Sequence, residues 1–183
     1  MSDGLAARIL QLHGALDRAD LPHAFGGAIA LAYCTADPRG TKDIDVNVFV
    51  DPSRLDEVLA ALPAGLEATE VQRIQLTRDG QARLWWDETP VDLFLSNVPF
   101  HDHAAAGLHR VPFAGVADLP VIACADLAVF KALFARPKDA LDVAAMIAAG
   151  ALDRRRLEET VTAMLGEGER RRFFERVDDA LAG

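Results

Sequence analysis

The sequence has no long apolar run, and this shortage argues against a membrane protein. The longest apolar stretch, residues 119–130, is interrupted by Asp126 and is too short to span a bilayer. A signal peptide has a basic region followed by a long apolar run, and residues 1–4 do not begin such a pattern. We therefore expect a cytoplasmic protein with no membrane partner.

Basic residues are also scarce. The chain has 19 lysines and arginines against 28 aspartates and glutamates, which gives a formal net charge of −9, and its pI is near 4.9. This balance argues against a protein that holds nucleic acid mainly through a basic surface. The charge balance does not exclude an RNA substrate that is bound by a small local group of residues.

Cysteine occurs only twice, at Cys34 and Cys124, and each residue lies in an apolar segment with a helical pattern. Free cysteine is among the most buried residue types, and cytosolic thiols stay reduced. We therefore expect two buried free thiols in preference to a disulfide.

What the sequence does contain is enough apolar material for one well-buried core. The chain has 183 residues, of which 51% are hydrophobic and 26% charged, as in ordinary globular proteins. Hydrophobic spacing and turn residues predict strands and helices along the whole chain. The predicted strands are 21–25, 43–50, 71–77, 82–86 and 91–95, with 108–122 as irregular or extended edge segments. The predicted helices are 5–20, 28–34, 55–62, 126–135, 138–149, 154–165 and 169–181, with 99–107 as a short helix or loop.

The order of these elements predicts an α+β fold, with a mixed sheet followed by helices. We expect residues 1–122 to form the catalytic core and residues 123–183 to form a helical segment packed on it, as a single compact unit. Asp79-Gly80 lies between two strand-like runs and predicts a hairpin there. In Trp85-Trp86, strand alternation predicts one core and one surface aromatic, which we prefer to a platform for stacking bases.

Two aspartates stand at alternate positions of an apolar strand, in Asp43-Ile44-Asp45-Val46. A strand has a side-chain period of two, so the two carboxylates point the same way. Hard cations such as Mg²⁺ take oxygen ligands, often one or two carboxylates together with substrate phosphates. A simpler alternative is that both acids lie at the exposed edge of a strand.

Two further features strengthen the metal hypothesis. Gly26-Gly27 predicts a tight turn into a helix start, where backbone N–H groups can approach phosphates. Asp92 places a third acid inside another strand-like run, Val91-Asp92-Leu93. Three acids on two strands can meet around a metal, so we expect a metal-dependent site for a nucleoside triphosphate.

The diglycine, the run Arg39-x-Thr41-x-Asp43-x-Asp45 and the later Val91-Asp92-Leu93 together resemble the signature of the nucleotidyltransferase superfamily. The fold of that superfamily resembles the catalytic domain of polymerase beta. Residues 126–133 and 136–143 are similar to the helical motif of the AbiEii branch, which includes toxins of type IV toxin-antitoxin systems.

This resemblance implies roles for individual residues. Asp43 and Asp45 would hold Mg²⁺ or Mn²⁺, and Asp92 would complete a second metal position and help to activate the acceptor hydroxyl. Lys131 lies in an apolar helix, so it either extends to the surface or meets an anion, and the resemblance favours phosphate. The nucleotide-binding residues would be Gly26, Gly27, Arg39, Thr41, Lys42, Lys131 and Arg136.

The implied reaction is transfer of a nucleoside monophosphate from a triphosphate such as ATP to an acceptor, with release of pyrophosphate. The AbiEii resemblance favours RNA, particularly a tRNA 3′ end, or a protein as the acceptor, and a toxin that is checked by an antitoxin. Two alternatives stay open. One is a small-molecule nucleotidyltransferase of the antibiotic-modifying type, and the other is a nucleotide-binding module without catalysis.

Overall fold

The structure is a computed structural model, and it describes residues 4–38 and 40–182. The chain forms two compact units. We call residues 1–27 and 40–122 the sheet unit, and residues 28–39 and 123–183 the helical unit. The segment 28–39, between the diglycine and the first aspartate, thus joins the C-terminal helices.

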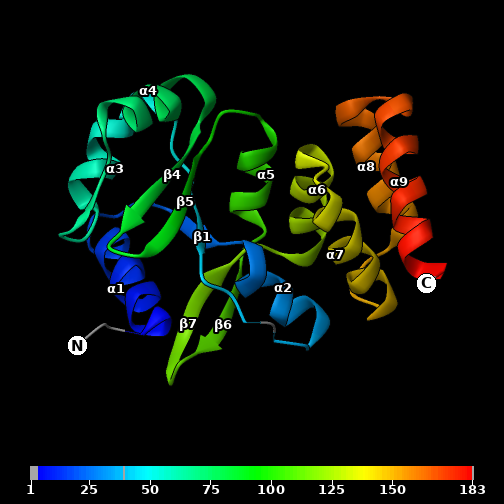
Figure 1. Cartoon of the computed structure of the whole chain (residues 1–183), viewed down its shortest axis with the longest axis horizontal. Helices are drawn as coiled ribbons and strands as arrows, with labels where there is room; N and C mark the ends of the chain where they lie inside the picture. Colours follow the sequence, from blue (N-terminus) through cyan, green and yellow to red (C-terminus); the bar gives the residue numbers. More distant parts are fainter. Residues whose placement is uncertain (1–3, 39, 183) are drawn as a thin grey trace. The chain divides into compact units, whose positions relative to one another are not determined.

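The sheet unit is built on a seven-stranded mixed sheet with the order β3-β4-β5-β2-β1-β7-β6. Figure 1 labels five of these strands, β4, β5, β1, β7 and β6. Two neighbouring pairs, β2 with β5 and β1 with β7, are parallel, and the other pairs are antiparallel. The strands are β1 (His23–Phe25), β2 (Ile44–Val48), β3 (Leu66–Glu67), β4 (Gln81–Trp86), β5 (Thr89–Leu95), β6 (His109–Phe113) and β7 (Val116–Val121). The helices are α1 (Leu5–Arg18), α3 (Leu55–Ala61), α4 (Glu70–Asp79) and α5 (Phe100–Ala106), with a 3₁₀ turn, η1, at Pro52–Arg54. The predicted α+β fold with a mixed sheet is confirmed.

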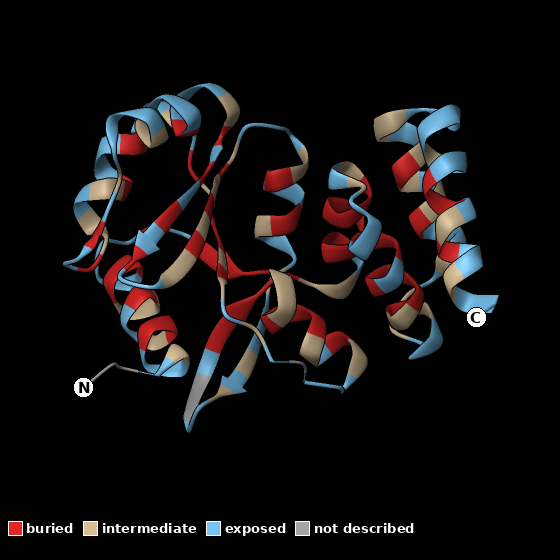
Figure 2. Cartoon of the chain, viewed as in Figure 1, coloured by how far each residue is buried: buried red, intermediate tan, exposed pale blue. Residues whose placement is uncertain are grey.

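Alternate residues of β4 are buried and exposed, as expected for a sheet with one covered face (Figure 2). Leu84 and Trp86 are buried, whereas Arg83 and Trp85 are exposed. The prediction of one core and one surface tryptophan is therefore confirmed. The same alternation continues in β5, where Val91 and Leu93 belong to the core.

The predicted strand 71–77 is wrong, because this segment forms helix α4. Its start is fixed by Thr69, whose hydroxyl accepts from the Gln72 backbone N–H while the Gln72 side chain accepts from the Thr69 N–H. Gly80 ends the helix in the left-handed conformation, with φ 68°. The glycine that predicted a hairpin is therefore a helix cap, and the true hairpin joins β4 to β5.

Other predicted boundaries shift or sharpen. The strand predicted over 43–50 is shorter, since β2 spans Ile44–Val48 and Asp43 directly precedes it. The strand predicted over 21–25 is reduced to β1. The extended alternative for 108–122 is confirmed, because this segment forms the β6–β7 hairpin at one edge of the sheet, with a register shift between Val111 and Phe113. Helix α5 confirms the helical alternative for 99–107.

The helical unit contains residues 28–35 of α2 (Gly27–Thr35) and four longer helices. These are α6 (Cys124–Phe134), α7 (Pro137–Ala148), α8 (Arg154–Leu165) and α9 (Glu167–Ala182). Their core includes Val143, Met146, Val161 and Phe173, each at most 1% exposed. Among the helices of residues 4–38 and 40–182, none combines the length and apolarity that crossing a bilayer requires.

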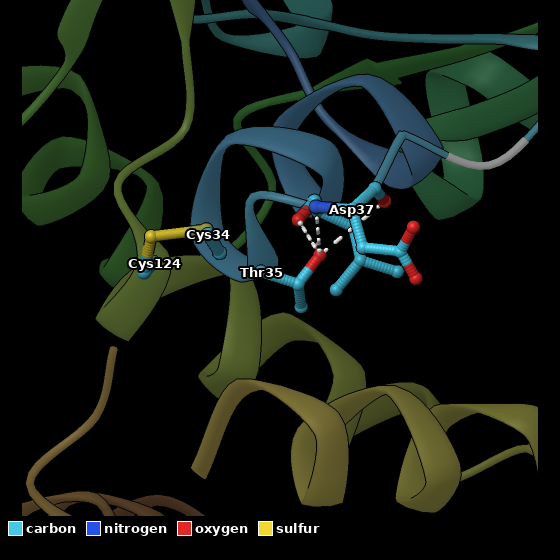
Figure 3. The surroundings of a disulfide bond; sticks show 5 residues. Cys34, Thr35, Asp37 and Cys124 are labelled. Carbon is cyan, nitrogen blue, oxygen red and sulfur yellow. Dashed lines mark hydrogen bonds between the residues drawn. A yellow bond between two sulfur atoms is a disulfide. The ribbon is translucent and has the colours of Figure 1, made fainter. Parts of the chain in front are cut away.

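The prediction of two free thiols is wrong, because Cys34 and Cys124 form a disulfide (Figure 3). Their Cα atoms are 5.6 Å apart, within the usual range for a bridge. Cys34 lies near the end of α2 and Cys124 is the first residue of α6, so the bond joins two segments of the helical unit. Because the two cysteines are 90 positions apart in the sequence, no local pattern indicated that they are close in space.

Candidate active site

The centre of the candidate site is the parallel pair of strands β2 and β5. Asp45 and Asp92 are direct partners in its register. The residues that flank them, Ile44, Val46 and Val91, are buried in the core. Because side chains alternate along a strand, both carboxylates lie on the opposite, more open face of the sheet.

Asp43 lies two residues before Asp45 and completes a group of three acids on this face. Its carboxylate accepts a hydrogen bond from the Thr41 hydroxyl. Its side chain is 30% exposed, compared with 17% for Asp92. Thr41, predicted to contact phosphate, is thus engaged in orienting an acid.

The diglycine lies directly against Asp45. The Gly26 N–H donates to the Asp45 carbonyl at 2.9 Å. Gly27 has φ +51°, and a Cβ built on it would lie 1.9 Å from Asp45 Oδ2. Only glycine can therefore occupy position 27 without moving the carboxylate.

Arg83 is a residue of the candidate site that the sequence interpretation missed. Its Nε and Nη2 donate to Oδ1 and Oδ2 of Asp92 at 2.7 and 2.6 Å, a two-pronged contact from the neighbouring strand β4. Its Nη2 also lies 3.8 Å from Asp43 Oδ2. The hydrogen bond to Asp92 raises the pKa of the Arg83 guanidinium, with smaller contributions from the charges of Asp43 and Asp45.

The remaining predicted residues of the sheet unit are less engaged. Lys42 is exposed and precedes the first aspartate. Arg39 lies outside the described residues. The nucleotide-binding roles of both residues stay predictions.

Lys131 and Arg136 belong to the helical unit, where they form ion pairs with two aspartates of α7. Lys131 is buried, and its Nζ lies 2.6 Å from Asp142 Oδ2 and 3.5 Å from Asp139 Oδ1. The Arg136 backbone N–H and Nε donate to Asp139 Oδ2 at 3.0 and 2.8 Å. Within this cluster Lys131 compensates two buried carboxylates. The nucleotide-binding roles of Lys131 and Arg136 stay predictions.

The acids of the sheet unit have the donor chemistry that Mg²⁺ or Mn²⁺ prefers, since all three supply carboxylate oxygens. Among the described residues, however, no group of three or more histidine, cysteine, aspartate or glutamate side chains is arranged to hold a metal. At Asp92, both carboxylate oxygens accept hydrogen bonds from Arg83. The chemistry of Asp43, Asp45 and Asp92 thus suits a divalent cation, and their roles as its ligands stay predictions.

The chain resembles known proteins in its three-dimensional structure. No family model matches, and no curated protein matches. Solved structures do match. The solution structure of the antibiotic-resistance factor ANT(2'')-Ia aligns with a TM-score of 0.65 at 16% identity, over 90% of this chain and 92% of that one.

Two further structures agree. The crystal structure of ANT(2'')-Ia in complex with adenylyl-2''-tobramycin gives a TM-score of 0.63 at 15% identity, over 95% of this chain and 99% of that one. An antigenic nucleotidyltransferase-like protein from Paracoccidioides brasiliensis gives 0.55 at 18% identity, over 97% and 93%. At 15–18% identity, the similarity to these structures shows the fold alone. The chain has the nucleotidyltransferase fold.

Proposed function

We propose that this chain transfers a nucleoside monophosphate from a nucleoside triphosphate to a hydroxyl group of a small-molecule acceptor. The observation that carries the proposal is the contact between Gly27 and Asp45, on the strand whose register pairs Asp45 with Asp92. This contact places the glycine turn, which has no side chains, beside the paired carboxylates of Asp45 and Asp92. Phosphates and their counter-cation need these two features together.

In this reaction the acceptor oxygen attacks the α-phosphorus, and the bond from that phosphorus to the pyrophosphate oxygen breaks. The acceptor hydroxyl gives its proton to solvent water as the new P–O bond forms. Asp43 and Asp45 would hold Mg²⁺ or Mn²⁺, which would supply charge stabilisation for the phosphoryl oxygens. Thr41 keeps the Asp43 carboxylate oriented, and Arg83 keeps that of Asp92 oriented.

Two facts support a small acceptor. The chain aligns over 95% of its length with ANT(2'')-Ia, whose complex contains adenylyl-2''-tobramycin, and it covers 99% of that protein. The net charge of −9 disfavours a polyanionic acceptor and suits a cationic one.

A second candidate is transfer to RNA, such as a tRNA 3′ end, or to a protein, in a toxin that an antitoxin controls. It is favoured by the sequence block that carries Lys131 and Arg136, because this block resembles the AbiEii branch. The third alternative is a nucleotide-binding module with the same fold that catalyses no transfer.

The test is incubation of the protein with α-labelled nucleoside triphosphates, Mg²⁺ and separate acceptor pools. The pools are amine-bearing polyols including tobramycin, total tRNA, and total protein. We expect label in the polyol pool and release of pyrophosphate, with loss of both for Asp45→Asn. Asp56→Asn, at an exposed surface ion pair with Arg73, is the matched control and should retain activity. Label in tRNA or protein would favour the second candidate, and no label in any pool would contradict catalysis.

A further inference from the structure

Trp85 is an exposed aromatic on the same face of the sheet as the candidate site. Its exposed fraction is 53%, whereas Trp86 beside it is 5% exposed in the core. Trp85 lies two positions after Arg83 on β4, so the two side chains point to the same face about 7 Å apart along the strand. An exposed indole at this place is not needed for the core.

The charged surroundings of Trp85 are predominantly acidic. Glu67 of β3 is its direct partner in the antiparallel register, so the Cβ atoms of the two residues lie about 5 Å apart on the same face. In the next row, Arg83 pairs with Asp92, and Asp92 with Asp45. Asp43 lies outside this row, but its Oδ2 is 3.8 Å from Arg83 Nη2. The three carboxylates together face one guanidinium, so an arriving cation meets a net negative field.

The order of strands also places Trp85 on a particular side of the acids. The diglycine touches Asp45 on β2, and the sheet then continues through Asp92 on β5 to Trp85 on β4. In phosphoryl transfer the attacking and leaving oxygens are roughly in line. If the triphosphate binds at the diglycine, Trp85 lies across the acids from it and stays free to contact the acceptor.

We propose that Trp85 and Glu67 form the acceptor subsite, in which the ammonium group of a small amine-bearing acceptor lies over the indole and beside the Glu67 carboxylate. This proposal rests on the proposed function and adds the acceptor's chemical class. A cation over the face of a tryptophan ring is attracted by the negative charge of that face. An uncharged polyol would gain neither this attraction nor the ion pair.

The first experiment measures binding by calorimetric titration, in wild type, Trp85→Ala and Glu67→Gln. The probes are tobramycin, glucosamine and ethanolamine, their N-acetylated forms, and Mg·ATP. Both substitutions should weaken binding of the amines, roughly tenfold for Trp85→Ala, and leave the affinity for Mg·ATP unchanged. Acetylation should cause a similar loss in the wild type. Both side chains are exposed, and thermal unfolding of each variant checks that the fold persists.

Three results would contradict the subsite. These are failure of all three amines to bind the wild type, unchanged amine affinity in both variants, and equal binding of amines and their acetylated forms. Weakened Mg·ATP binding in Trp85→Ala would instead assign the indole to the nucleotide base and overturn the proposal.

A pyrophosphate-release assay separates this proposal from the proposed function. If the amines bind through Trp85 and no pyrophosphate forms, the subsite stands and the transferase proposal fails. If uncharged acceptors are modified and Trp85→Ala keeps the same KM, the transferase stands and the subsite fails.

Discussion

The guanidinium of Arg83 holds both carboxylate oxygens of Asp92, one at 2.7 Å and one at 2.6 Å. This contact crosses from β4 to β5 at a registered pair of residues, so it is fixed by the hairpin that joins the strands. It makes Arg83 a positioning residue for the third acid of the candidate site. Lysine cannot reproduce it, because a single ammonium lacks the planar fork.

Substitution of Arg83 by lysine should therefore lower kcat by about 10- to 100-fold, as is typical for residues that orient metal-site carboxylates. The KM for the acceptor should change less, because the fold and the open face persist. Steady-state kinetics with labelled triphosphate measures both constants. Arg78→Lys, at an exposed pair with Asp79, is the control and should be silent. Equal kcat values for wild type and Arg83→Lys would exclude a positioning role.

Substitution of Gly27 by alanine should disturb both backbone and site. A left-handed conformation costs a non-glycine residue about 1–2 kcal/mol, and the added Cβ would lie 1.9 Å from Asp45 Oδ2. We expect a loss of stability of about that size in urea titration, together with weaker binding of Mg·ATP. Gly168→Ala, with nothing within 4 Å of its added Cβ, should leave nucleotide affinity unchanged. Normal affinity in Gly27→Ala would show that Asp45 need not hold its observed position.

Lys131→Met tests the ion-pair cluster of the helical unit. Removing the ammonium leaves the buried carboxylates of Asp139 and Asp142 undercompensated, which typically costs 3–5 kcal/mol. Urea unfolding should show this loss, while exposed Lys138→Met should unfold like the wild type. If Lys131→Met kept its stability and lost affinity for Mg·ATP, the predicted phosphate role would replace the structural one.

The histidine pair of the sheet unit makes stability depend on pH. His23 Nδ1–H donates to the Leu21 carbonyl at 2.7 Å, so its Nε2 accepts from His13 Nδ1–H at 2.8 Å. Burial lowers the pKa of both imidazoles below the ordinary value of 6.5. The unfolded chain then binds more protons than the folded chain, so the free energy of unfolding falls as the pH drops below about 6.5.

Chemical denaturation between pH 7.5 and 5 measures this slope. His23→Gln should flatten it, and His109→Gln, an exposed histidine at the start of β6, should not. An identical slope in wild type and His23→Gln would assign the pH dependence to other groups.

The acids of the candidate site were predictable because their signal is local. Asp45 and Asp92 each interrupt an apolar strand, and a two-residue period then fixes the face on which each lies. The place of Arg83 depends on which residue of β4 pairs with Asp92, and that register is set by the hairpin at 86–89. A prediction of that hairpin, in place of the one at Asp79-Gly80, would have found the arginine.

Helix α4 shows why alternation alone misleads over a short segment. A strand pattern fits Val71, Arg73 and Thr77. Only Leu76 of this helix is buried, however, so the positions of its apolar residues do not indicate which face of the segment is covered. The capping pair Thr69 and Gln72 was the better signal. The disulfide had no local signal, because it depends on how α2 and α6 meet.

The disulfide gives the oxidised chain the topology of a ring with two tails. Residues 34–124 form the ring, which contains strands β2 to β7 and all three site aspartates. Gly27 lies in the N-terminal tail and Lys131 in the C-terminal tail. A single proteolytic cut inside the ring therefore leaves one covalent molecule until a reductant is added, whereas a cut in a tail releases a fragment at once. Electrophoresis with and without reductant distinguishes the two, and it thereby reports whether the strands bearing the aspartates are cross-linked end to end.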